Sequence, residues 1–267
     1  DYRTFAMSLF LLSFFLVYGS MHAYALLKAR SALATGPGAT LALLLLLAVL
    51  VCAPVATHLL SRAGYEHAAR TVAYVGYLWM GFLFFLTCLN LCVDILRLPL
   101  WALGRGGIAP NASAGLAGRP AFLCVVALAV ALSAYSIVEA SRIQVVRVRI
   151  GTDRLPASVP SLRIAQITDL HLGLVHRNGK ARDVAAIVSR EHPDIFVSTG
   201  DLVDGELDGV AGLAEALRGI PAPRGKFATL GNHEYYAGID RAIAFTRKSG
   251  FTLLRDESVT IDDAVRI

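Results

Sequence analysis

The chain has 267 residues and a formal net charge of +5; 55% of its residues are hydrophobic and only 17% are charged. Soluble globular domains carry about 25% charged residues, so this composition excludes an ordinary soluble protein. Residues 1–140 hold eight Lys/Arg against four Asp/Glu, and residues 141–267 hold 17 against 16. The excess positive charge does not lie on a folded polar domain, so we expect no nucleic-acid partner.

Residues 1–140 are predicted to form a transmembrane region with four helical spans. Each of four apolar segments is long enough to cross a bilayer, which takes about 20 residues. Pro54 predicts a kink in the second segment, and the third continues past Asp94 toward Leu103. The four predicted spans are residues 5–27, 39–60, 71–92 and 120–140.

The carboxylates and cysteines of this region are expected to have structural roles. Asp94 and Glu139 are candidates for a transport role, but both lie near span ends, where we expect them to be solvated or paired. All four cysteines also lie in this half. Their placement excludes a disulfide framework or a cysteine-type zinc site from residues 141–267.

The orientation of the spans is weakly encoded. With four spans, the N-terminus, the second loop and the polar domain share one side of the membrane. Seven arginines near the membrane fall on that side, against five Lys/Arg on the other. The positive-inside rule therefore favours a cytoplasmic polar domain only slightly.

Residues 141–267 are predicted to form an α/β domain. Alternating charged and apolar residues predict a first strand within residues 141–150. Further strands alternate with helices, as expected of largely parallel strands. The predicted strands are 162–168, 194–199, 226–230, 251–255 and 264–267, and the predicted helices are about 179–191, 209–219 and 239–249.

Three of these strands are followed at once by residues that can bind metal. Asp169 and His171 follow the first, Asp201 follows the second, and Asn232 follows the third. Because ligands bind at the carboxyl ends of parallel strands, we expect these four side chains to converge. Oxygen and imidazole ligands favour Mn, Fe or Zn over calcium. Two such ions, which the two oxygens of Asp201 can bridge, suit phosphoryl transfer.

Three blocks in this half resemble the motifs of a known family. They are TDLH at 168–171, GD at 200–201 and GNHE at 231–234. These blocks resemble the D-x-H, G-D and G-N-H-[DE] motifs of calcineurin-like metallophosphoesterases. The residues around them are similar to the sequences of the bacterial membrane-associated branch of that family. The resemblance covers residues 163–267. It implies a two-sheet sandwich flanked by helices, of which this chain supplies the first half.

The resemblance also implies a role for each motif residue. Asp169 and His171 are expected to bind the first of two divalent ions. Asp201 is expected to bridge the two ions, and Asn232 to bind the second. His233 is expected to face the substrate, where it stabilises phosphoryl oxygens or protonates the leaving alcohol.

Three other residues have two open interpretations each. Glu234 either orients neighbouring groups or lies on the surface. Asp204 either supports the site from behind its ligands or extends the acidic surface. Arg177 either contacts a substrate phosphate or is a solvated loop charge.

The sequence departs from the family in one respect. The family completes its site with three more histidines, and no histidine follows His233 in these 267 residues. We interpret the departure as a truncation at Ile267, with a degenerate domain as the rival interpretation. The chain alone is then expected to hold metal poorly and to be inactive or weakly active.

The function predicted from the sequence is a membrane-anchored, binuclear-metal phosphoester hydrolase in which a metal-bridged hydroxide attacks phosphorus. Its partners are the lipid bilayer, in a bacterial cell membrane, and a phosphorylated small molecule or lipid. The alternative is a catalytically inactive membrane sensor or scaffold with a phosphoesterase-like binding domain. A motif block with the missing histidines would favour the enzyme.

Overall fold

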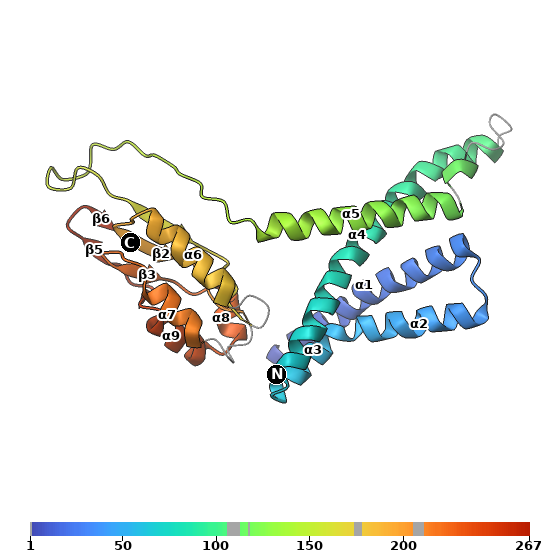
Figure 1. The fold of residues 1–267 in the computed structure, drawn as a ribbon, viewed down its shortest axis with the longest axis horizontal. Coiled ribbons are helices and arrows are strands. Elements are labelled where there is room, and N and C mark those ends of the chain that lie inside the picture. The colour runs from blue at the N-terminus through green and yellow to red at the C-terminus, as the bar shows by residue number, and fades with distance from the viewer. Residues whose placement is uncertain (1, 106–112, 117, 174–177, 205–210) are drawn as a thin grey trace. The chain divides into compact units, whose positions relative to one another are not determined.

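The computed structural model describes residues 2–105, 113–116, 118–173, 178–204 and 211–267 (Figure 1). The chain divides into two compact units, Asp1–Arg142 and Ile143–Ile267. Each unit has its own buried apolar cluster, and each is described here by itself.

Unit 1 consists of long helices. Its helices are α1 (Tyr2–Leu33), α2 (Pro37–Val51), α3 (Ala53–Arg62), α4 (Glu66–Arg105) and α5 (Arg119–Ser141), with a short 3-10 turn, η1, at Ala114–Leu116. Three of them are individually long and apolar enough to cross a membrane: Leu11–Leu33 within α1, Glu66–Arg105 and Arg119–Ser141. These helices indicate a membrane protein.

The predicted second span is broken. Helices α2 and α3 are bent by 48° across a break at Cys52, so the number of candidate spans is three, or four only if the bent pair is one span. Pro54 lies in the first turn of α3, where its missing N–H costs no hydrogen bond. The predicted kink is thus confirmed, and it divides the segment into two helices.

The third predicted span extends as expected. Helix α4 runs on past Asp94 and through Pro99 to Arg105. Asp94 contacts Lys28 and accepts a hydrogen bond of 2.6 Å from the Tyr24 hydroxyl. The expectation that this carboxylate is paired is confirmed.

The interior of unit 1 is formed by α1, α4 and α5. Tyr18, Leu83, Leu86 and Ala129 are buried at the contact of these helices. Many other apolar side chains of the same helices are exposed, as expected of surfaces that face lipid acyl chains.

Unit 2 contains a four-stranded parallel sheet in the order β1-β2-β3-β4. Its strands are β1 (Ile164–Ile167), β2 (Ile195–Ser198), β3 (Lys226–Ala228) and β4 (Thr252–Leu253), and a separate antiparallel hairpin joins β5 (Thr260–Ile261) to β6 (Val265–Arg266). The helices of this unit are α6 (Asn178–Arg190), α7 (Ala211–Arg218), α8 (Asn232–Tyr236) and α9 (Ile239–Lys248). The predicted α/β domain with parallel neighbours is confirmed.

The two faces of this sheet are covered differently, and β2 shows why. Phe196 points to the face where α6, α7 and α9 pack, and it is fully buried there. Ile195 points to the opposite face, where it packs with Ile261 of the hairpin. Since successive strand residues face opposite sides, the apolar residues 195–197 of β2 supply both layers.

The structure of residues 142–267 differs from the sequence-based prediction at three places. Residues 142–150 form no strand, and Val146, Val148 and Ile150 are 81%, 77% and 82% exposed. Alternation alone does not make a strand, because a strand needs a hydrogen-bonded neighbour. The other two differences are elements that were not predicted. Helix α8 has five residues, too few to show a helical period, and β5 has only two.

Candidate metal centre

The loops after β1 and β2 run side by side beyond the sheet. The His171 N–H donates to the Asp201 carbonyl at 3.0 Å, and the Asp204 N–H donates to the Leu172 carbonyl at 2.8 Å. Leu172 and Leu202 are buried, which anchors both loops to the core. The parallel pairing thus continues past the strands and carries polar residues from both loops to one edge of the sheet.

Three polar residues of these loops have a left-handed backbone. The φ angles are 53° at Asp169, 47° at His171 and 49° at Asp201. Such conformations cost about 1–3 kcal/mol each in residues other than glycine and cluster at functional sites. The inter-loop hydrogen bonds hold these residues in place.

Five of the side chains form two overlapping groups. In the first, one ligand atom each of Asp169, His171 and Asp201 lies within 4.8 Å of the others. In the second, the same holds for His171, Asp204 and His233. His171 belongs to both groups, and its Nε2 lies 3.9 Å from Asp169 Oδ1.

This donor set fits a divalent cation. The first group combines two carboxylates with an imidazole, the hard and borderline ligands that Mn, Fe and Zn accept. Two carboxylates that share a site repel each other when both are ionised. A bound cation between Asp169 and Asp201 would remove that repulsion.

The loop after β3 meets the loop after β2 through two glycines. A Cβ atom on Gly231 would lie 2.7 Å from the Asp201 backbone nitrogen, and a Cβ atom on Gly200 would lie 2.8 Å from the Gly231 nitrogen. Both distances are below those that real Cβ atoms allow. Close approach lets the His233 N–H donate to Asp201 Oδ1 at 2.9 Å.

Glu234 joins the same two loops from inside the protein. Its side chain is only 1% exposed, so the surface interpretation is wrong. Oε2 accepts the N–H of Gly231 at 2.7 Å and that of Asp201 at 3.1 Å. Oε1 accepts the N–H of Leu202 at 2.8 Å and that of Val203 at 3.3 Å. One carboxylate therefore fixes the spacing between the two loops.

His233 is held by side chains on two sides. Its Nδ1 lies 3.2 Å from Asp204 Oδ1. Its ring meets the His171 ring edge-on at a centroid distance of 4.4 Å, and the Tyr236 ring at 5.4 Å. Asp204 therefore contacts a site residue and is not only part of an acidic surface.

The other two residues predicted from the sequence, Asn232 and Arg177, belong to neither group of ligand atoms among the described residues. Asn232 is the first residue of α8, between Gly231 and His233, and its side chain is exposed. Arg177 lies outside the described residues. For every residue predicted at this site, the role as a metal ligand or substrate contact stays a prediction.

Two further residues contact the site, and the sequence assigned neither of them a definite role. The Thr168 hydroxyl donates to Asp169 Oδ2 at 2.5 Å, which orients that carboxylate. Tyr236 packs on His233, although its side chain is 70% exposed. The adjacency of Thr168 and Asp169 is a signal for the first; nothing in the sequence distinguishes Tyr236 from Tyr235.

Comparison with known proteins finds similarity to one family in the region that carries this site. Residues 162–262 match the family model for calcineurin-like phosphoesterase. A protein of Aquifex aeolicus named "Uncharacterized metallophosphoesterase" is 43% identical over 136 residues, which cover 51% of this chain and 52% of that protein. No solved structure matches the chain significantly.

Two further relatives have informative names. A "Transmembrane protein with metallophosphoesterase domain" of Danio rerio is 32% identical over 156 residues, 58% of this chain and 34% of that protein. A "UDP-2,3-diacylglucosamine pyrophosphatase LpxG" of Chlamydia trachomatis is 35% identical over 106 residues, 39% of this chain and 32% of that protein. The chain thus spans about half or less of the length of these relatives.

Proposed function

We propose that this chain, whose residues 162–262 form a domain of the calcineurin-like phosphoesterase family, belongs to a membrane-anchored, metal-dependent phosphoester hydrolase. One observation carries the proposal: Asp169, His171 and Asp201 from two neighbouring loops present ligand atoms within 4.8 Å of one another. The apolar helices of unit 1 support the anchor.

The domain is proposed to be one half of a two-sheet sandwich. The four-stranded sheet is one layer, and the β5–β6 hairpin packs on the face opposite the helices, where a second layer would lie. The domain then comprises residues 141–267, and four spans within residues 1–140 count the bent α2–α3 pair as one.

Metal ligation is assigned to four residues. Asp169 and His171 would hold one divalent ion, Asp201 would bridge to a second, and Asn232 would bind the second ion from the start of α8. A pair of Mn, Fe or Zn ions would supply charge neutralisation at the phosphoryl oxygens and a hydroxide nucleophile near neutral pH. Metal binding would explain why these loops hold strained left-handed residues (Asp169, His171 and Asp201) and two glycines in close contact (Gly200 and Gly231).

His233 is assigned the substrate contact. Its Nδ1 is held by Asp204, so Nε2 is the ring nitrogen available to a phosphoryl oxygen or to the leaving oxygen. If Asp204 accepts the Nδ1 proton, the ring orientation is fixed, and a proton on Nε2 can pass to the leaving alcohol. Tyr236 limits rotation of the ring from the other side.

Glu234 is assigned a positioning role. It touches no substrate in this scheme, but its four backbone hydrogen bonds set the distance between the loop that carries Asp201 and the loop that carries Asn232. Residues that orient metal ligands from behind typically change metal affinity or activity about 10–100-fold when mutated.

The substrate is proposed to be a phosphoester or pyrophosphate linked to a lipid or an envelope precursor. The apolar helices of unit 1 and the named activity of the Chlamydia relative support this class. We place the protein in a bacterial cell membrane, with a slight preference for a cytoplasmic catalytic domain. The alternative is a non-catalytic membrane sensor or scaffold with a phosphoesterase-like binding domain.

The proposal is tested with the intact protein in detergent micelles. Hydrolysis of bis(p-nitrophenyl) phosphate, p-nitrophenyl phosphate and a lipid-linked pyrophosphate is measured with added Mn²⁺. His171→Gln should abolish turnover, since His171 belongs to both ligand groups. His192→Gln, in an exposed loop position after α6, is the matched control and should retain it. Equal turnover of the two variants would reject the assignment, and no turnover by the wild type with metal bound would favour the scaffold.

A further inference from the structure

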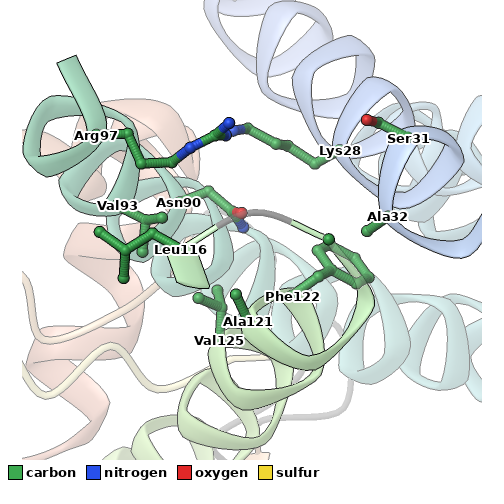
Figure 2. Close-up of a pocket in the computed structure, with 11 residues that line it drawn as sticks. Lys28, Ser31, Ala32, Asn90, Val93, Arg97, Leu116, Ala121, Phe122 and Val125 are labelled. Carbon is green, nitrogen blue, oxygen red and sulfur yellow. The ribbon is translucent and has the colours of Figure 1, made fainter. Parts of the chain in front are cut away.

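A small polar cavity lies in unit 1, where the end of α1 meets α4 and the start of α5. Its volume is about 70 Å³, well above the roughly 10–15 Å³ that one water molecule needs. Figure 2 shows Lys28 from α1 and Arg97 from α4 extending toward each other across it, with Asn90 beside them. A compact group of several heavy atoms can therefore enter.

The charges around this cavity are not balanced. Lys28 and Arg97 approach the same oxygen of one carboxylate, Asp94 Oδ1, and the Arg97 Nη1 stays 3.9 Å from it. Two cations facing one carboxylate leave a net charge of +1. The Arg97 Nε is buried and has no hydrogen-bond partner among the described residues. A buried donor without an acceptor is destabilising, so an anion would satisfy both the charge and the donor.

The first turn of α5 adds further donors. Gly118 is its N-cap, Pro120 follows in the first turn, and no side chain of the described residues caps the helix. Gly118, Ala121 and Phe122 line the cavity. Pro120 has no N–H and the Phe122 N–H donates to the Gly118 carbonyl at 3.2 Å, so the backbone donors left at this end are those of Arg119 and Ala121. The N-terminus of a helix also carries a partial positive charge, which favours anions.

The opposite wall of the cavity is apolar. Phe122 and Val125 of α5 and Val93 of α4 form it (Figure 2). The three helices that meet there are the ones individually long and apolar enough to cross a membrane. A ligand with an anionic group and an adjoining apolar part matches these two walls.

We propose that this cavity binds the phosphate group of a membrane phospholipid, held by Lys28, Arg97 and the N-terminus of α5. Basic pockets between transmembrane helices are suited to anionic headgroups. The site is separate from the candidate metal centre, and it does not depend on the proposed hydrolysis. Inorganic phosphate shares the chemistry of the headgroup and is the alternative source to be distinguished.

The test is native mass spectrometry of the intact protein released from detergent micelles. Three probes are titrated: dioctanoyl phosphatidylglycerol, dioctanoylglycerol without phosphate, and inorganic phosphate. The wild type should retain phosphatidylglycerol in preference to dioctanoylglycerol, and inorganic phosphate should compete only weakly because it lacks the apolar part. Equal retention of the two lipids would overturn the proposal, and inorganic phosphate binding as tightly as phosphatidylglycerol would overturn the lipid source.

Variants locate the binding to this cavity. One basic residue near a lipid phosphate contributes about fivefold in affinity, so Arg97→Met should weaken phosphatidylglycerol binding about fivefold. The substitution leaves Asp94 paired, because Lys28 still contacts it. Arg30→Met, exposed in the last turn of α1, is the matched control and should change little. Ala121→Leu keeps every charge but fills the cavity, and should also weaken binding. Equal affinities of the Arg97 and Arg30 variants, or no effect of Ala121→Leu, would contradict the assignment.

Discussion

Replacing Glu234 by Gln tests the positioning role of this carboxylate. Each carboxylate oxygen accepts two backbone N–H groups, one oxygen from Gly231 and Asp201, and the other from Leu202 and Val203. Gln keeps one acceptor oxygen and turns an NH₂ group toward the other two donors, so two hydrogen bonds are lost. Hydrogen bonds to a charged group contribute about 1.5–3 kcal/mol each, which gives a loss of about 3–6 kcal/mol in the free energy of unfolding.

The same change should loosen the metal site. The lost bonds hold the Asp201 loop against the loop that begins α8, so we expect metal affinity to fall about 10–100-fold. Urea unfolding of the metal-free protein measures the first effect, and isothermal titration with Mn²⁺ measures the second. Glu215→Gln, exposed on α7, is the matched control and should change neither quantity.

The outcome separates a positioning role from a structural one. Loss of stability with unchanged Mn²⁺ affinity would show that Glu234 only supports the fold. Unchanged stability would contradict the hydrogen-bond network itself. Glu234→Asp keeps the charge but is one methylene shorter, and it should recover stability only in part because it does not reach both loops.

Three further predictions concern the same loops. Gly231→Ala should abolish Mn²⁺ binding, since its Cβ would lie 2.7 Å from the Asp201 nitrogen, whereas Gly219→Ala, with its nearest atom at 3.6 Å, should be neutral in the same titration. Asp204→Asn should lower kcat more than it lowers the Mn²⁺ affinity measured by calorimetry, because Asp204 orients His233 through a 3.2 Å contact. A larger effect on metal affinity than on kcat would instead make Asp204 a metal ligand. Removing metal with EDTA should abolish turnover and lower the melting temperature, by an amount equivalent to about 2.7 kcal/mol at 100-fold ligand excess over Kd; turnover that survives chelation would refute the metal dependence.

The central strands and the grouping at the sheet edge follow from local sequence. The run at 195–197 is apolar at both faces of the sheet, as a buried parallel strand requires. Loops at the carboxyl ends of neighbouring parallel strands meet, so Asp169, His171 and Asp201 lie together in the structure. Their roles as ligands are still predictions.

The burial of Glu234 was not decided by the sequence. A glutamate in a turn resembles a surface residue, because its four partners here are backbone N–H groups that have no sequence signature. The break of α2 at Cys52 was anticipated only as a kink, since Pro54 marks the position but not the angle. The strand predicted at 141–150 failed because alternation shows amphipathic character and cannot show whether a neighbouring strand exists.

The most direct test of the account is the metal content of the intact protein with Asp201→Asn, measured by inductively coupled plasma mass spectrometry after gel filtration. Asp201 is the residue assigned to bridge two ions, so the variant should lose metal and phosphoester turnover together. Asp183→Asn, exposed on α6, is the control and should retain both. An Asp201→Asn protein with wild-type metal content and wild-type turnover would contradict the proposed site.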